Sequence, residues 1–411
     1  MIDERHDPEA IVKFAEALLS RQIDQEARLA PDSVFPGFKS VVVRCRVKGR
    51  GAGLPDTLIV KKAREDRMGY FPDSQATPNA AHELFNDWAA ARFLDGLGHD
   101  PPLSPRFYAG DREHGLIVLE DLGDGEAPNT IDALQGLNPQ LAEQTLGEHA
   151  ALLGKLHAAT IGRYEEYRQI RLGLGPAPQP LKLYHDPWSE ARLSHIPTSD
   201  VDEAISSYRA VFAALEIRSQ PGVEDEIAHV TTVVEADPGP FLAYCKGDQN
   251  AAGDYLRRQT KPRLFDFDAG GFRHALIEGM PGRMTWGCQM RIPPRVQSGM
   301  EKAYQTALSS GYAEAADDRV FYRGLIEAGA RWNILHLIHR VPAALSGDYQ
   351  RGLTTLRQQV VAWLEAFADL SDERQQLQAL GKSAREAVKR LRELWPAEVC
   401  SLPYYPAFRI I

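Results

Sequence analysis

The chain has 411 residues, which is enough for one large or two medium-sized domains. Its net charge of −9 leaves no excess of Lys and Arg to neutralise phosphates, so we expect no nucleic-acid partner. No apolar run approaches the ~18 residues of a membrane span, and the acidic start has no apolar core of a signal peptide. The four cysteines lie far apart and predict neither a zinc site nor a disulfide framework, which favours a cytoplasmic protein without a membrane partner.

The first part of the chain predicts a small sheet accompanied by helices. Apolar residues at helical spacing predict a helix within residues 1–33. Alternating apolar side chains predict strands at 41–47 and 57–61, and the glycine-rich stretch 48–56 between them predicts a hairpin loop. Two further elements complete this part, a helix at 79–97 and a short buried strand within 114–125.

Helical periods dominate after residue 125. Helices are expected at 139–158, 202–215, 298–311, 319–338, 350–369 and 383–395. In the last of these, Ser383 and Glu386 have the spacing of a capping box, which predicts that the helix opens at Ser383. One pair of strands, around 241–246 and 263–267, interrupts the helices, and we expect these strands to pair as a hairpin-like unit.

Together these elements predict an α+β fold with two lobes. A small antiparallel-sheet lobe comes first, and a larger, mostly helical lobe follows it, with a hinge near 120–125. We divide the chain into an N-terminal helical segment at 1–33, an N-lobe at 34–123 and a helical C-lobe at 124–411.

Carboxylates gather at the ends of the two strands in the helical part. The stretch "KGDQNAAGD" (246–254) follows one strand and carries Asp248, and "LFDFDAGG" (264–271) carries Asp266 and Asp268. Clustered carboxylates repel one another unless a cation lies among them, and hard oxygen ligands suit Mg²⁺. We therefore expect a magnesium ion that bridges phosphate oxygens, beside a further carboxylate that orients a hydroxyl group and accepts its proton.

The order of these parts resembles the aminoglycoside phosphotransferase family, relatives of the protein kinases that phosphorylate small molecules. The resemblance spans about residues 34–280 and is carried by six stretches in the expected order: "LIVK" (58–61), "NDWAAARFL" (86–94), "LIVLEDLG" (116–123), "LLGKLHAAT" (152–160), "KGDQNAAGD" (246–254) and "LFDFDAGG" (264–271). It implies a bilobal protein-kinase-like fold and an ATP-dependent O-phosphotransferase that uses Mg²⁺ and acts on a hydroxyl of a small-molecule substrate. GTP stays open as the donor.

In the N-lobe, the resemblance implies a lysine that contacts the nucleotide α/β-phosphates and an acid that pairs with it. Lys61 takes the first role, with Lys62 as the alternative, because a shift of one residue turns a strand side chain to the other face. Asp87 matches the acid, and Glu83, one helical turn earlier, is the alternative.

Two N-lobe segments complete the implied nucleotide site. The loop "FPGFKS" (35–40), with Gly37 and Ser40, would cover the phosphates with its backbone N–H groups. Glu120 and Leu122 flank the expected hinge, where the backbone would hydrogen-bond the adenine.

In the C-lobe, the resemblance implies that Asp248 is the catalytic base, that Asp266 binds magnesium and that Asp268 supports a metal or its water shell. The chain departs from the family at two places. Lys246 stands where the family has a histidine, and Gly253 stands where it has an asparagine as a second metal ligand.

A loop that is one residue longer would let Asp254 take the ligand role, with Asn250 as the alternative. The two departures also keep a second function open, that of a degenerate kinase which binds nucleotide or serves as a scaffold without turnover. The acceptor stays open among aminoglycosides, amino alcohols, sugars and natural products.

Overall fold

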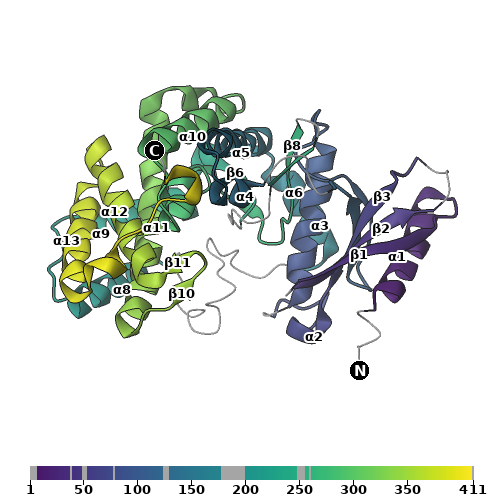
Figure 1. Ribbon diagram of the computed structural model, residues 1–411, viewed down its shortest axis with the longest axis horizontal. Coiled ribbons are helices and arrows are strands. Elements are labelled where there is room, and N and C mark those ends of the chain that lie inside the picture. Colours follow the sequence, from purple (N-terminus) through teal and green to yellow (C-terminus); the bar gives the residue numbers. More distant parts are fainter. Residues whose placement is uncertain are drawn as a thin grey trace.

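The computed structural model describes residues 7–37, 39–48, 53–76, 79–123, 129–176, 200–247, 255–258 and 261–409. Figure 1 shows a sheet-containing lobe at one end of the molecule and a larger helical lobe at the other. This is the α+β, two-lobed architecture that the sequence predicts. No helix in the described part of the chain is both long and apolar enough to cross a membrane.

The N-terminal lobe is built on a five-stranded antiparallel sheet in the order β1-β2-β3-β5-β4. Its strands are β1 (Leu29–Pro36), β2 (Ser40–Val47), β3 (Thr57–Ala63), β4 (Phe107–Asp111) and β5 (Leu116–Glu120). The predicted strands at 41–47, 57–61 and within 114–125 are confirmed as β2, β3 and β5. Strands β1 and β4 were not predicted; they are the two edge strands of the sheet, and each contains a register shift.

Two helices cover the two faces of this sheet (Figure 1). Helix α1 (Pro8–Ile23) packs Ile11, Ala15 and Leu19 against the alternate apolar side chains of β2 and β3. Helix α3 (Ala80–Gly96), predicted at 79–97, covers the other face, and the short α2 (Glu65–Met68) precedes it. The segment 1–33 therefore contributes α1 and the start of β1 to the core of the sheet lobe.

The second lobe is mainly helical. Its longer helices are α4 (Thr130–Gln135), α5 (Pro139–Thr160), α6 (Tyr164–Leu174), α8 (Val201–Ala214), α9 (Val223–Thr231), α10 (Pro294–Leu308), α11 (Asp318–Ser346), α12 (Leu356–Arg374) and α13 (Gln378–Leu394). Helices α5 and α10 approach closely at Gly154, where an added Cβ would lie 2.6 Å from the backbone oxygen of Tyr304. Part of the predicted helix at 350–369 is instead a two-stranded hairpin of β10 (Gln350–Arg351) and β11 (Thr354–Thr355), and α12 begins at Leu356.

The predicted pairing of strands 241–246 and 263–267 is wrong. Strand β6 (Leu242–Cys245) pairs with β9 (Gly271–His274), whereas β8 (Lys261–Leu264) pairs with β7 (Tyr255–Arg258). The reason lies at Asp266, whose φ of 63° belongs to the left-handed region and interrupts the extended chain between β8 and β9. Asp266 and Asp268 therefore lie on the connection between two strands and not at the end of a hairpin partner of β6.

The predicted opening of the last helix at Ser383 is also wrong. Helix α13 begins at Gln378, and Ser383 is buried inside it. The first N–H groups of the helix are satisfied from another element, because the Glu226 carboxylate of α9 accepts hydrogen bonds from the N–H groups of Ala379 and Leu380, at 3.2 and 2.7 Å. A tertiary partner thus supplies the cap that the local sequence does not.

Candidate active site

Lys61 lies between two carboxylates from opposite lobes. Its Nζ is 2.6 Å from Oδ2 of Asp87 on α3 and 2.7 Å from Oδ1 of Asp266. Strand β3 determines this orientation, because Leu58 and Val60 face the core under α1 and alternate residues face α3. Because side chains alternate along the strand, Lys61 lies on the α3 face, where the acids are.

Lys62, the alternative lysine, lies elsewhere. Its Nζ is 2.8 Å from Oε1 of Glu65 and 5.9 Å from the centre of the Tyr70 ring. A one-residue step along β3 reverses the side-chain direction, so the register of the strand places Lys61 at the acids and Lys62 away from them.

Helix α3 holds the connection between β8 and β9 in place. Oδ1 of Asp87 accepts a hydrogen bond from the N–H of Phe267 at 3.1 Å. Asn86 donates from Nδ2 to the backbone oxygen of Asp268 at 2.9 Å, and its Oδ1 accepts from Nε of Arg171 at 2.7 Å. No role was predicted for Asn86, and its position beside Asp87 in "NDWAAARFL" was the only available signal.

A second lysine makes a parallel connection. Nζ of Lys39, which follows the loop at Gly37, is 3.1 Å from Oδ2 of Asp268 and 3.3 Å from Oε1 of Glu83. The two alternative acids of α3 are therefore both used, Asp87 with Lys61 and Glu83 with Lys39. Sequence reasoning missed Lys39, and its only signal was its place in "FPGFKS".

The two acids of the β8–β9 connection are in different electrostatic states. The positive charge of Lys61 lowers the pKa of Asp266 well below its usual range, and this effect exceeds the opposing effect of burial. Burial, together with the negative charge of Asp266, raises the pKa of Asp268 to about 6. The Asp266 side chain is 46% exposed and that of Asp87 only 4%, so Asp266 is the acid that a ligand can reach.

The lysines remain protonated in spite of burial. Burial lowers the pKa of Lys61, but the charges of Asp266 and Asp87 outweigh it and raise the pKa well above the ordinary value. The pKa of Lys39 is raised in the same way, because Asp268 and Glu83 outweigh the effect of burial. The site therefore combines fixed ammonium groups with carboxylates, which is the combination that binds phosphates and a divalent cation.

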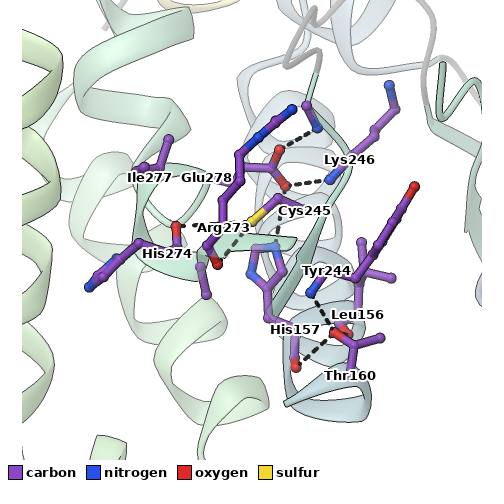
Figure 2. A network of polar contacts seen from close by, with 12 residues as sticks. Leu156, His157, Thr160, Tyr244, Cys245, Lys246, Arg273, His274, Ile277 and Glu278 are labelled. Atoms are coloured by element: carbon purple, nitrogen blue, oxygen red, sulfur yellow. Dashed lines mark hydrogen bonds and ion pairs between the residues drawn. The ribbon is translucent and has the colours of Figure 1, made fainter. Parts of the chain in front are cut away.

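The strand end that precedes Asp248 is tied to a buried glutamate. Figure 2 shows the carboxylate of Glu278, which accepts hydrogen bonds from the backbone N–H groups of Lys246 and Gly247 at 2.9 and 2.6 Å. His157 of α5 lies on the other side, with Nε2 3.2 Å from Glu278 and Nδ1 2.6 Å from the Tyr304 hydroxyl. His157 is fully buried, which is consistent with a structural role for this helix residue.

His157, Cys245 and Glu278 together also have the spacing of a metal-binding group. The carboxylate of Glu278 is already engaged by two N–H groups and by His157. Burial raises the pKa of the Cys245 thiol well above its ordinary value, whereas a metal requires the thiolate. The arrangement therefore suits a hydrogen-bonded tether for the chain at Lys246 and Gly247 better than a metal centre.

Lys246, which replaces the histidine of the family motif, is buried. Its Nζ donates a hydrogen bond to the backbone oxygen of Asp266 at 2.9 Å. Its charge also contributes to the lowered pKa of Asp266. Lys246 thus joins the end of β6 to the connection that carries the two acids.

The loop at 35–40 is anchored at both ends of its turn. The N–H of Gly37 donates to the backbone oxygen of Ser40 at 2.9 Å, and the Gly37 oxygen accepts from Nη1 of Arg64 at 3.1 Å. An added Cβ at Gly37 would lie 2.9 Å from that Ser40 oxygen, so the turn requires a residue without a side chain. In this structure the Gly37 N–H that we expected to face phosphates is bonded within the loop.

The expected hinge residues lie at the end of β5. The Glu120 carboxylate accepts hydrogen bonds from Nη1 of Arg263 at 2.6 Å and from the N–H of Arg106 at 3.1 Å. Leu122 is buried. Neither side chain is free for a ligand, which leaves the backbone as the part of this segment that could bind one.

The structure thus brings Lys61, Asp87, Asp266 and Asp268 together, with Lys39 and Glu83 added to them. The three residues of the 248–254 stretch for which we expect catalytic or metal-binding roles lie outside the described residues: Asp248, Asn250 and Asp254. Their expected roles stay predictions.

No protein-family model and no curated protein matches the sequence. Solved structures that are similar include a choline/ethanolamine kinase family protein from Mesorhizobium loti, with 14% identity, a TM-score of 0.37, and coverage of 93% of this chain and 99% of that one. An aminoglycoside phosphotransferase from Alicyclobacillus acidocaldarius has 12% identity, a TM-score of 0.43, and coverage of 91% and 96%. A macrolide 2'-phosphotransferase from Brachybacterium faecium has 14% identity, a TM-score of 0.40, and coverage of 82% and 94%.

These proteins are small-molecule kinases and phosphotransferases, the class that the sequence motifs resemble. Identities of 12–14% and TM-scores below 0.5 leave the activity of this chain to be argued from its own residues.

Proposed function

We propose that the protein is an ATP-dependent O-phosphotransferase that transfers the γ-phosphoryl group to a hydroxyl of a small molecule. The proposal rests on the position of Lys61. Its Nζ lies 2.6 Å from Oδ2 of Asp87 and 2.7 Å from Oδ1 of Asp266. An acid of α3 holds this protonated lysine beside an exposed, ionised carboxylate from the other lobe. Such an arrangement suits a nucleoside triphosphate with its metal ion. The six motifs in kinase-like order support the same reaction.

The residues fit a magnesium ion. Asp266 offers a hard oxygen donor, its lowered pKa keeps it ionised at neutral pH, and its side chain is accessible. Asp266 and Asp254 would hold the ion, and Asp268 would support its surroundings. When bound, magnesium would supply neutralisation of charge on the phosphate oxygens.

The protein groups would then act by position and charge. Lys61 would be oriented by its hydrogen bond to Asp87 and would bind the α/β-phosphates close to Asp266, which it contacts in this structure. Asp248 would hold the acceptor hydroxyl in line and accept its proton as the new oxygen–phosphorus bond forms and the bond to ADP breaks. Glu278 would fix the chain before Asp248 through the N–H groups of Lys246 and Gly247. We place this reaction in the cytoplasm.

A second function is favoured by the two departures from the motif. Lys246 and Gly253 replace a histidine and a metal-binding asparagine, as expected for a degenerate kinase that binds nucleotide without turnover. Lys246 donates a hydrogen bond to the backbone oxygen of Asp266, so it has a structural role in the site. Its replacement of the histidine is therefore compatible with an active enzyme, which we favour.

The two functions are separated by an acceptor screen. Purified protein is incubated with ATP, with and without Mg²⁺, and a library of amino alcohols, aminoglycosides, sugars and hydroxylated natural products, and ADP release is measured. Magnesium-dependent release above the rate without acceptor supports the transferase, whereas nucleotide binding without release supports the degenerate kinase.

The chain offers a matched pair of variants for the screen. Lys61→Met should abolish nucleotide binding, and Lys62→Met, at the next position and bonded to Glu65, should leave it unchanged. Equal nucleotide affinity of the two variants would contradict the placement of the phosphates at Lys61.

A further inference from the structure

A cavity in the helical lobe shares no residue with the cluster around Lys61. Its volume is about 640 Å³, which lies within the range of small-molecule sites. Its walls come from the segment 283–292, the start of α10, the part of α12 from Ala362 to Arg374, and the C-terminal segment 400–404. Figure 1 shows α10 and α12 in the helical lobe, apart from the five-stranded sheet. The proposed phosphotransfer assigns no role to this cavity.

One wall of the cavity, the segment 283–292, is fixed by contacts within the protein. The backbone oxygen of Gly282, which precedes it, accepts a hydrogen bond from Nε2 of Gln297 at 3.1 Å. Arg283 is held by two acids, with its Nε 2.6 Å from Oε1 of Glu301 and its Nη1 3.3 Å from Oε1 of Glu373. This wall is therefore preformed, and little ordering of it is required when a ligand binds.

The acidic side chains of the cavity already have partners. Glu365 and Asp369 pair with two arginines of α13, Arg392 at 2.6 Å and Arg385 at 2.8 Å. Glu373 is the third acid and is engaged by an arginine of the preformed wall. A cationic ligand would have to displace an arginine from one of these carboxylates. The acids therefore do not favour a cation in the cavity.

Two arginines of the cavity, in contrast, form no ion pair with the described residues. The guanidinium of Arg374 lies over the ring of Tyr322, with Cζ 3.3 Å from the ring centre, and its buried Nε has no hydrogen-bond partner. The backbone of Arg291 is fixed by hydrogen bonds with Pro403 and Tyr405, at 2.8 and 3.2 Å, and its side chain is exposed. A buried guanidinium N–H without a partner is unfavourable, and the planar group matches a carboxylate or a phosphate.

Two further features of the walls favour an anion that has an organic part. Helix α10 begins at Pro294 in the cavity wall and has no acidic residue in its first turn, so its own side chains leave the positive end of its dipole uncompensated. Apolar surface lies on the same cavity and is provided by Ile292, Ala362, Ala366 and Leu402. The cavity therefore combines positive groups for an anion with an apolar wall for the rest of the ligand.

We propose that this cavity is a second ligand site, which binds a small organic anion through a carboxylate or phosphate group held by Arg291 and Arg374. The apolar wall contacts the organic part of the ligand, and Arg283 stays with its two acids. The site is separate from the phosphate contact proposed at Lys61, so its occupation does not require nucleotide.

The test uses phenyl phosphate and benzoate as probes, because each combines an anionic group with an apolar ring. Their binding to the full-length protein is measured by isothermal titration calorimetry, with the neutral benzyl alcohol as the reference. We expect at least one of the two anions to bind at one site per protein. Benzyl alcohol should bind at least about 10-fold more weakly, the scale of one lost charge-assisted hydrogen bond. The anion that binds more tightly identifies whether the arginines hold a phosphate or a carboxylate.

Variants then locate the bound probe. Arg374→Gln and Arg291→Gln should each weaken its binding at least about 10-fold. Arg295→Gln is the matched control, because Arg295 belongs to the same turn of α10, pairs with Glu143 at 2.6 Å and does not line the cavity. This control should bind the probe normally. Lys61→Met should also bind it normally, since that lysine lies in the other lobe.

Three results would overturn the proposal. The first is the absence of binding of either anion at millimolar concentrations. The second is unchanged affinity in the folded Arg374 and Arg291 variants. The third is loss of binding in Lys61→Met, which would place the anion at the proposed nucleotide site. Because Arg291 has an exposed side chain, Arg291→Gln keeps the test decisive if Arg374→Gln does not fold.

Discussion

Glu278→Gln tests the link between the buried core and the catalytic position. The carboxylate of Glu278 accepts hydrogen bonds from the N–H groups of Lys246 and Gly247 and contacts Nε2 of His157. Asp248, the proposed base, is the next residue in the chain. Glutamine has almost the same shape but only one accepting oxygen, so its NH₂ group must face at least one of the donors.

The expected loss can be worked from these contacts. Hydrogen bonds to a charged group contribute about 1.5–3 kcal/mol each, and an unsatisfied buried donor costs about 1–3 kcal/mol. Loss of one accepting oxygen at this buried site should therefore lower the free energy of unfolding by about 2–4 kcal/mol. If Gly247 moves by roughly 1 Å, the turnover number should also fall by about 10²-fold.

The assay combines urea unfolding with steady-state kinetics and nucleotide calorimetry. We expect Glu278→Gln to lower stability and kcat while the affinity for Mg²⁺-ATP stays close to normal, because Lys61 and Asp87 are untouched. Glu226→Gln is a matched control, since Glu226 also accepts two consecutive N–H groups, those of Ala379 and Leu380. Helices α9 and α13, which it joins, lie at the opposite end of the molecule from the sheet (Figure 1).

The control should lose stability without a loss of kcat. Normal kcat in a Glu278→Gln variant that has lost stability would refute the positioning role. An equal fall of kcat in the two variants would show that the effect follows general destabilisation.

The remaining predictions concern the metal and the response to acid. Asp266→Ala should abolish the Mg²⁺ dependence of ATP affinity, and an unchanged dependence in calorimetry would disprove the metal assignment. Asp254→Asn should be tolerated, Asp254→Ala should raise the Mg²⁺ requirement severalfold, and Asn250→Ala should have little effect; a metal-bound structure with Asn250 on the ion would reverse this assignment. Burial, with a contribution from the charge of Lys246, lowers the pKa of His149 from 6.5 to about 3. As the pH drops below 6.5, this histidine is protonated in the unfolded chain before it is protonated in the folded one. The free energy of unfolding therefore falls with the pH. This histidine should cost about 1.4 kcal/mol per pH unit, and His149→Gln should show a shallower decline in urea unfolding than the unaltered chain.

The N-lobe site could largely be predicted because its signals are local. The alternation of β3 places Lys61 on the face of α3, and the helical period places Glu83 and Asp87 one turn apart. The choice between Lys61 and Lys62 depends on the register of β3 in the sheet. The assignment of the two acids depends on Lys39, which pairs with Glu83 and leaves Asp87 to Lys61. Lys39 follows a turn without a periodic pattern, so its partner Asp268, 229 residues away, could not be derived from spacing.

The errors have different origins, and in only one of them does a distant partner override the local pattern. The edge strand β1 contains Pro31 and Pro36 and a register shift, features that weaken a strand signal. The start of α13 is capped by Glu226 from another helix and not by Ser383. Strand β6 pairs with β9, and the left-handed Asp266 interrupts the extended chain between β8 and β9. The conformation of a single residue leaves no trace in hydrophobic periodicity.

The most direct test of the account is phosphoryl transfer by the unaltered chain and by Asp248→Asn. With an acceptor identified in the screen, the phosphorylated product and ADP are measured together over time with saturating Mg²⁺-ATP. The account predicts equal amounts of product and ADP, and a turnover about two to four orders of magnitude lower in Asp248→Asn with unchanged ATP affinity, because the amide cannot accept the hydroxyl proton. A variant that retains more than about a third of normal turnover would contradict the role of Asp248, since loss of a positioned base has a far larger effect.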